Sequence, residues 1–260
     1  VTFPALEKEQ YIGGTAEFVF DNSIINGLNM IEGTRAKVSF RHYEGISDKE
    51  QSFSNLKVDV RHYQKLHRQL VLAFRGFYGS FMGRDPKQYL LGGVDNWVLR
   101  DENTEGSGNP LNTSRERSNA DLLFVEYATN LRGFDYAQFF GNNVLLFNAE
   151  LRMPIVQYLS GGPISSNFFR NLQFTGFFDI GSAWSGKSPF NEDNQISNVE
   201  INQGNFDIDL RNYRNPWLYS YGVGLRTMLL GYYVKFDVAW PVEDFVTQDT
   251  RFHLSLGYDF

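Results

Sequence analysis

The chain of 260 residues contains no cysteine, which excludes a disulfide framework and any thiolate metal site. It also lacks a run of about 18 consecutive apolar residues, the length that a transmembrane helix requires. Its formal net charge of -6 argues against a dedicated nucleic-acid-binding protein, because such proteins normally present a basic face. These absences leave open an all-β protein that is either soluble or crosses a membrane as a barrel.

Recognisable catalytic and metal-binding patterns are absent as well. The four histidines show no metal-ligand spacing, and the sequence contains no GxSxG motif, no HExxH motif and no glycine-rich phosphate loop. Glu150 and Asp179 can be imagined as an acid–base pair, but carboxylates paired with arginine are the simpler interpretation. We therefore expect no enzymatic activity and no bound cofactor or metal.

The sequence does contain alternating apolar and polar residues in segment after segment. In the last ten residues, RFHLSLGYDF, every second position is aromatic or leucine. Successive side chains of a strand point to opposite faces, so one face of this segment is apolar and the other is polar. The apolar face of this predicted terminal strand consists of Phe252, Leu254, Leu256, Tyr258 and Phe260.

The same alternation elsewhere predicts an all-β fold of about ten strands and no convincing amphipathic helix. The predicted strands cover residues 15–20, 35–41, 56–61, 70–77, 88–92, 145–153, 172–184, 217–226, 232–240 and 251–260.

The composition of the two faces indicates where these strands lie. The polar face combines charged side chains with glycines and hydroxyls, whereas the apolar face ends in tryptophan and tyrosine at Trp184, Trp217, Tyr219, Tyr232 and Trp240. Apolar-out, polar-in alternation with aromatic girdles is typical of an outer-membrane β-barrel, in which closure leaves no unpaired backbone edge. A soluble β-sandwich also alternates, but it rarely places these aromatic residues so regularly at strand ends.

Connection lengths favour the barrel. The segment 229–231 is a tight turn, whereas 97–142 and 185–216 are long, polar loops. Short turns at one rim and long loops at the other are typical of the periplasmic and extracellular sides of such barrels. Two connections, 44–51 and 154–169, are longer than this scheme predicts.

Two short motifs carry a resemblance to a known family. Leu131-Arg132-Gly133-Phe134 (LRGF) precedes the predicted strand 145–153, and Phe177-Phe178-Asp179-Ile180-Gly181 (FFDIG) lies on the next strand. In this order before a C-terminal phenylalanine, they resemble the [VI]RG[FY] loop motif and the [FG]xDxG strand motif of the BamA and TamA superfamily of outer-membrane assembly and translocation barrels, also called the bacterial surface antigen domain.

The resemblance implies a barrel of about sixteen strands. Residues 1–260 are then its C-terminal portion, with 97–142 and 185–216 as extracellular loops and the C terminus in the periplasm. Further N-terminal strands and periplasmic domains, often POTRA repeats, are expected to precede it. The last strand of such barrels carries a recognition signal that the assembly machinery reads by adding it to an exposed sheet edge.

The motif residues also suggest a specific interaction. Period two places Glu150 and Asp179 on the polar face of neighbouring strands, so the guanidinium of Arg132 can bridge both carboxylates through forked, charge-assisted hydrogen bonds. Gly133 lets the loop turn beside the wall, and Phe134 and Phe177 pack under it. The alternative is that Arg132 is a solvated loop charge and Asp179 one of many inward-facing charges.

Three functions remain possible at this point. The first is a barrel that inserts or translocates polypeptides at the outer membrane, by lateral opening of a weak seam and movement of the motif loop. The second is a passive pore or transporter, and the third is a soluble or surface-exposed β-protein that binds a partner. For the first function the expected partners are outer-membrane lipid, polypeptide clients and accessory periplasmic or surface subunits, with no nucleic acid.

Overall fold

A computed structural model describes the chain in segments. The described residues are 9–46, 51–98, 109, 111, 119–160, 162–191, 194, 198–203, 206–211 and 214–260. The predicted strands fall largely within these residues, whereas much of the predicted loops 97–142 and 185–216 lies outside the described residues.

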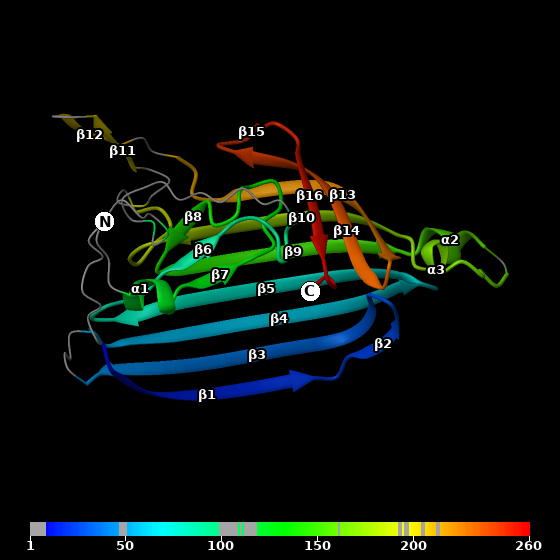
Figure 1. The fold of residues 1–260 in the computed structure, drawn as a ribbon, viewed down its shortest axis with the longest axis horizontal. Coiled ribbons are helices and arrows are strands. Elements are labelled where there is room, and N and C mark those ends of the chain that lie inside the picture. The colour runs from blue at the N-terminus through cyan, green and yellow to red at the C-terminus, as the bar shows by residue number, and fades with distance from the viewer. Residues whose placement is uncertain are drawn as a thin grey trace.

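One antiparallel sheet of eleven strands dominates the structure (Figure 1). Its strands follow the order β1 (Tyr11–Asp21), β3 (Met30–Gly45), β4 (Phe53–His67), β5 (Leu70–Gly83), β9 (Asn143–Met153), β10 (Gln173–Trp184), β13 (Leu218–Leu229), β14 (Tyr232–Glu243) and β15 (Val246–Thr247). Two further strands pair beside this path, β2 (Ile24–Gly27) with β3 and β16 (Arg251–Leu256) with β14. The all-β prediction is therefore confirmed, while the sheet is open: within the described residues β1 pairs only with β3.

The strands are long enough to cross a bilayer. The strands β9 and β1 have 11 residues each, β10, β13 and β14 have 12, and β3 has 16. A tilted transmembrane strand needs about 9–11 residues. The predicted alternation appears in β9, where Leu145, Phe147 and Leu151 are exposed and Leu146, Asn148 and Arg152 are buried.

The two faces of the sheet therefore differ as the sequence pattern predicts. The outer face carries the exposed apolar side chains, and the inner face is the one that carries Leu146 and Arg152. One of the predicted aromatic residues departs from this scheme, because Trp184 is buried at 9% exposure, whereas Tyr232 is 65% exposed.

A small second sheet lies against the inner face. It consists of β6 (Tyr89–Leu91), β7 (Glu126–Ala128) and β8 (Phe139–Gly141), in the order β7-β6-β8, and it lies in front of β5, β9 and β10 in Figure 1. The predicted strand 88–92 corresponds to β6, but it belongs to this small sheet and not to the main sheet. Its run of apolar residues is buried on both sides, so it lacks the alternation of a wall strand.

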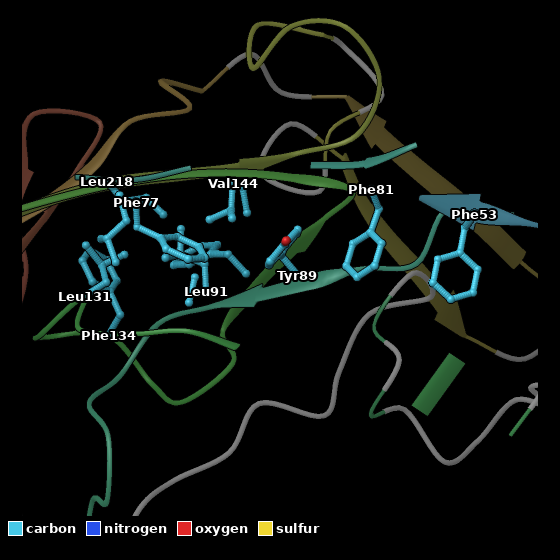
Figure 2. Packing of buried hydrophobic residues seen from close by; sticks show 13 residues of the cluster. Phe53, Phe77, Phe81, Tyr89, Leu91, Leu131, Phe134, Val144 and Leu218 are labelled. Atoms are coloured by element: carbon cyan, nitrogen blue, oxygen red, sulfur yellow. The ribbon is translucent and has the colours of Figure 1, made fainter. Parts of the chain in front are cut away.

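An aromatic and aliphatic core joins the two sheets. Figure 2 shows Phe77, Val144 and Leu218 of the main sheet packed with Tyr89, Leu91 and Leu131 of the inner segment. Tyr89 also donates a hydrogen bond from its hydroxyl to Oδ1 of Asn55 (2.5 Å). The inner segment is therefore held by apolar burial rather than by continuation of the wall ladder.

Helices are few and short. They are α1 (Asn119–Leu123), α2 (Ile155–Leu159) and α3 (Asn167–Arg170). In the part of the chain that the structure describes, no helix has the length and apolar character needed to cross a membrane. The long connection 154–172 between β9 and β10 owes its length to α2 and α3, which the sequence pattern did not indicate.

The connections between strands fall into two groups, one at each end of the sheet. The turn between β13 and β14, the turn between β4 and β5, and the α2–α3 connection lie at one end, and the C-terminal residues of β16 run toward it. The hairpin of β11 (Asn198–Gln203) and β12 (Phe206–Arg211) and the connection that contains β6–β8 lie at the other (Figure 1).

The chain terminus departs from the predicted alternation. The strand β16 ends at Leu256, and Gly257 adopts a φ of 104°, a left-handed value that glycine tolerates best. Phe252, Leu254 and Tyr258 are exposed, but Phe260 is 6% exposed and packs on the inner face with Met30 and Tyr63. Phe260 therefore does not share the outward face of Phe252, Leu254 and Leu256.

Candidate functional site

The LRGF segment lies on the inner face between β7 and β8. Leu131 is fully buried and forms an isolated bridge with Gly93, in which each backbone N–H donates to the other residue's carbonyl oxygen (3.0 and 3.1 Å). This bridge fixes the backbone immediately before Arg132. The arginine side chain consequently points at β9 and β10, the two wall strands that carry its acidic partners.

Arg132 forms a forked pair with Asp179. Its Nε donates to Oδ2 (2.6 Å) and its Nη2 donates to Oδ1 (2.7 Å), while its backbone N–H donates to Oδ2 (3.2 Å). The remaining guanidinium nitrogen, Nη1, donates to Oε1 of Glu150 (2.7 Å). Both carboxylates have side-chain exposures of 0% and Arg132 has 2%, so one guanidinium bridges two buried carboxylates on neighbouring strands.

Two further side chains complete the environment of this pair. Asn148 donates from Nδ2 to Oδ1 of Asp179 (2.7 Å) and to the carbonyl oxygen of Asn130 (2.6 Å), so it joins the wall to the loop. The ring of Phe177 lies 3.7 Å from the guanidinium carbon of Arg132, a distance typical of a cation–π contact. Burial alone would lower the pKa of Arg132, but Asp179 and Glu150 raise it well above its ordinary value.

Gly133 and Phe134 hold the other end of the motif. Gly133 has a φ of 90°, and a Cβ at this position would lie 3.0 Å from Cβ of Pro241, so glycine permits both the turn and the close approach to β14. Its backbone N–H donates to Nε2 of His253 on β16 (2.8 Å). Phe134 is 2% exposed and meets Phe139 edge to face with ring centres 5.6 Å apart.

The buried ion pairs of the LRGF site continue to the C-terminal residue. Glu150 also pairs through Oε2 with Nη2 of Arg152 (2.8 Å). The same Nη2 donates to a terminal oxygen of Phe260 (3.1 Å), and the guanidinium carbon lies 5.1 Å from the Phe260 ring. A continuous chain of charged contacts therefore runs from Arg132 through Glu150 and Arg152 to the last residue.

A second cluster of buried ions fixes Asp259, the residue before Phe260. Oδ2 of Asp259 accepts from Nε of Arg226 (3.0 Å) and from Nδ2 of Asn29 (2.8 Å), and Lys235 lies 3.4 Å from Oδ1. Arg226 also donates from Nη1 to Oδ1 of Asp237 (2.8 Å). Burial alone would raise the pKa of Asp259, but Arg226 and Lys235 hold it below its ordinary value.

The structure thus brings most of the residues singled out by sequence into one site. Leu131, Arg132, Gly133 and Phe134 meet Glu150, Phe177 and Asp179, while Gly181 lies two residues further along β10, against Leu146. The apolar residues of the terminal strand lie elsewhere: Phe252, Leu254 and Leu256 face outward on β16.

Sequence reasoning missed the contribution of the terminal tail. Alternation placed Arg152 and Arg226 on the inner face, but no local pattern indicated that Asp259 and Phe260 cross to meet them. The one available signal was Gly257, because a glycine near the end of an alternating strand can mark a bend.

This arrangement provides electrostatic fixation rather than acid–base chemistry. Each carboxylate of the LRGF site is paired with an arginine, which does not release its proton at physiological pH. Among the residues that the structure describes, no group of three or more histidine or acidic side chains could hold a metal ion. The interactions of the site hold the loop on the wall of the sheet.

Comparison with protein-family models assigns the chain to a known superfamily. The model of the Omp85 superfamily domain matches residues 22–260. No curated protein matches the chain. The matched range includes the LRGF segment, both of its acidic partners and the terminal strand.

Proposed function

The chain belongs to the Omp85 superfamily, whose members are outer-membrane proteins, and from this premise we propose that it inserts or translocates polypeptides at the outer membrane. The observation that carries the proposal is the buried bridge from Arg132 to Asp179 and Glu150. The proposal includes no catalytic step and no cofactor. Its partners are lipid, polypeptide clients and accessory periplasmic or surface subunits.

The energetics of the bridge favour a functional role over a purely stabilising one. Removing charges from water costs several kcal/mol for each ion, and a buried ion pair often repays little more than that cost. If these residues served only to stabilise the sheet, well-packed apolar residues of similar volume would stabilise it equally well. The pair's distinctive effect is to fix one loop position, because loss of either partner leaves a buried charge without compensation.

The terminal strand supports the second element of the proposal, a seam that opens. Six residues of β16 pair with β14, which has 12 residues. The opposite edge of β16 pairs with a short segment of the same chain: Val98 donates to the carbonyl oxygen of Leu254 (2.8 Å), and Leu256 donates to that of Asn96 (3.2 Å). When residues 96–98 leave that edge, it can accept other backbone, the interaction by which an extended polypeptide joins a sheet.

In this proposal the barrel is oriented with the C terminus in the periplasm. The tight turn between β13 and β14 then lies at the periplasmic rim, and the connections that contain β6–β8 and β11–β12 lie at the extracellular rim. Members of the superfamily have more strands than the open sheet described here, so we propose that residues 1–260 form the C-terminal part of a larger barrel of about sixteen strands.

A passive pore or transporter is the second candidate. Charged side chains of β1 and β3 remain partly exposed on the inner face, including Lys37 (49%) paired with Glu17 (35%). Such a wall could select solutes by charge. This alternative predicts appreciable ion conductance while the LRGF loop remains in place.

A charge-swap cycle in the full-length protein tests the proposal. The variants are Arg132→Glu, Asp179→Arg and the double change, scored by heat-modifiable folding in outer membranes and by the levels of other outer-membrane proteins. Each single change is expected to impair one or both, and the double change to restore them in part. Arg251→Glu is the matched control, because Arg251 forms a pair of similar length with Asp135 (2.9 Å) that is more exposed, at 45% and 27%.

The two readouts separate folding from function. If the single variants fold but lower the levels of other outer-membrane proteins, and the double variant restores those levels, the loop acts in polypeptide insertion. If the single variants fold, client levels stay normal and conductance rises, the passive-pore function replaces the proposal. If the single changes have no effect on any readout, the buried bridge has no role in either function.

A further inference from the structure

The connection 154–172 between β9 and β10 forms an unusual structure at the rim nearest the C terminus. It holds α2 and α3, although β13 and β14 are joined at the same rim by a tight turn. Short turns suffice to join antiparallel strands. The extra residues therefore call for an explanation other than connection of the two strands.

Both helices are fastened to the rim of the wall by hydrogen bonds. The hydroxyl of Tyr158 lies 3.1 Å from Nδ1 of His67, an exposed residue at the end of β4. The carbonyl oxygen of Phe168 accepts a hydrogen bond from Oγ1 of Thr227 on β13 (3.1 Å). Thr227 shares the outward face of Leu225, which is 45% exposed, so α3 lies beside the apolar outer face rather than beneath the inner one.

Large apolar side chains on this rim point away from the protein. Leu159 of α2 is 76% exposed, and Phe169 of α3 is 52% exposed. On the neighbouring β13–β14 turn, Leu230 is 91% exposed and Tyr232 is 65% exposed. Contiguous exposed apolar side chains on a folded protein mark a surface that another phase or molecule covers.

Positive charges accompany this apolar surface. Arg170 follows Phe169 on α3, and its guanidinium donates to Oδ1 of Asn167. Arg68 lies in the turn between β4 and β5 and is exposed. Neither arginine has a carboxylate partner among the residues that the structure describes. Aromatic and leucine side chains interspersed with unpaired cations suit the boundary between phospholipid headgroups and acyl chains.

We propose that α2, α3 and the β13–β14 turn form an interfacial lipid-binding surface, the rim patch, that lies in the headgroup boundary of the leaflet nearest the C terminus. Its members are Leu159, Phe168, Phe169, Arg170, Leu230 and Tyr232. The bilayer is the occupant because the rim patch continues the outward apolar face of β13 through Thr227. The inference requires a sheet that spans the membrane and is independent of polypeptide insertion.

The test measures depth in the bilayer by site-directed spin labelling. The 260 residues contain no cysteine, so a single cysteine introduced at Leu159, Phe169 or Leu230 of the full-length protein is the only one within this part of the chain and can carry a nitroxide. The protein is placed in phosphatidylethanolamine–phosphatidylglycerol vesicles, and collisions of the label with oxygen and with a water-soluble nickel chelate are compared. Two reference labels replace Phe178, which is 39% exposed in the middle of β10, and Phe190, which is 53% exposed beyond the other end of β10.

The rim-patch labels are expected to show less contact with nickel than the label at 190, and a depth shallower than the label at 178. A nickel accessibility equal to that at 190 would place the helices in water and overturn the proposal. Labels shielded from both oxygen and nickel would show that protein covers the surface, which also overturns it. Because the side chain of Leu230 is almost fully exposed, its replacement keeps the test valid even if a helix variant fails to fold.

Discussion

The inner faces of the two halves of the sheet share an alternating sequence but differ in their surroundings. On β9, β10, β13 and β14, charged side chains are sealed: Glu150 and Asp179 are both 0% exposed, and Arg226 and Asp237 are 0% and 2% exposed. On β1 and β3, the pair of Lys37 and Glu17 is 49% and 35% exposed at a similar distance, 3.0 Å.

The difference lies in what covers the wall. The LRGF segment and the terminal tail both cross to the first region, where each adds an ion pair. The LRGF segment also adds apolar side chains there, whereas the ring of Phe260 packs on residues of β3, β4 and β5. No described segment covers β1, whose residues after Tyr11 are all exposed. Water weakens the Coulomb energy of an exposed pair, whereas exclusion of water makes each buried partner indispensable.

The largest expected effect that tests this contrast comes from Glu150→Gln. The substitution removes the carboxylate shared by Arg132 and Arg152, so two buried guanidinium groups lose a counter-ion. We expect a loss of about 3–5 kcal/mol in the free energy of unfolding, the usual cost of breaking a buried pair. Urea titration of the protein in bilayers, followed by heat-modifiable migration, measures it.

The matched control is Glu17→Gln on the exposed half of the wall. It breaks a pair of similar length with Lys37, and an exposed pair contributes only about 0–1 kcal/mol. Equal losses for the two variants would contradict the contrast and would indicate that β1 is also covered in the membrane-embedded protein.

The next effect concerns the tail, and Phe260→Ala isolates its apolar contact. Phe260 is 6% exposed and packs with Met30, Tyr63, Val71 and Ala73. We expect a loss of about 3 kcal/mol, near the lower end for deletion of a buried phenylalanine ring, because the chain end can adjust. Phe252→Ala is the control, since its ring is 61% exposed on the outer face. A larger loss for Phe252→Ala than for Phe260→Ala would be incompatible with an inward tail.

The smallest expected effect comes from Gly222→Ala on β13. A Cβ there would overlap the backbone carbonyl oxygen of Val238 on β14 and Cζ of Phe177, whose ring lies against Arg132. Overpacking of this kind costs about 1–3 kcal/mol. Gly176→Ala is a close control, because no atom lies within 4 Å of its Cβ position. Indistinguishable stabilities for these two variants would show that the Val238 backbone and the Phe177 ring can both move without loss of stability.

Several wall strands could be predicted closely because their two faces meet different environments. The predicted segments 145–153 and 172–184 correspond to β9 (Asn143–Met153) and β10 (Gln173–Trp184). The prediction for 88–92 failed in its placement, because β6 is buried on both sides and carries no alternation. The helices α2 and α3, of 5 and 4 residues, are too short to show helical periodicity.

The LRGF site was predictable in part. Period two alone places Glu150 and Asp179 on one face of adjacent strands, and a pair of short motifs suggested the loop that meets them. The roles of Arg152, Arg226 and Asp259 were not predictable, because they depend on the path of the backbone after β16.

The sequence by itself determined the strands, the apolar and polar faces and the absence of cysteine, because these follow from side-chain identity and a period of two. Only the tertiary structure decided which part of the polar face is sealed. The LRGF segment and Phe260 contact wall residues that are far away in sequence, and no local pattern specifies which distant segments meet. The same alternation therefore produces a buried ion cluster on β9 and β10 and a solvent-exposed wall on β1.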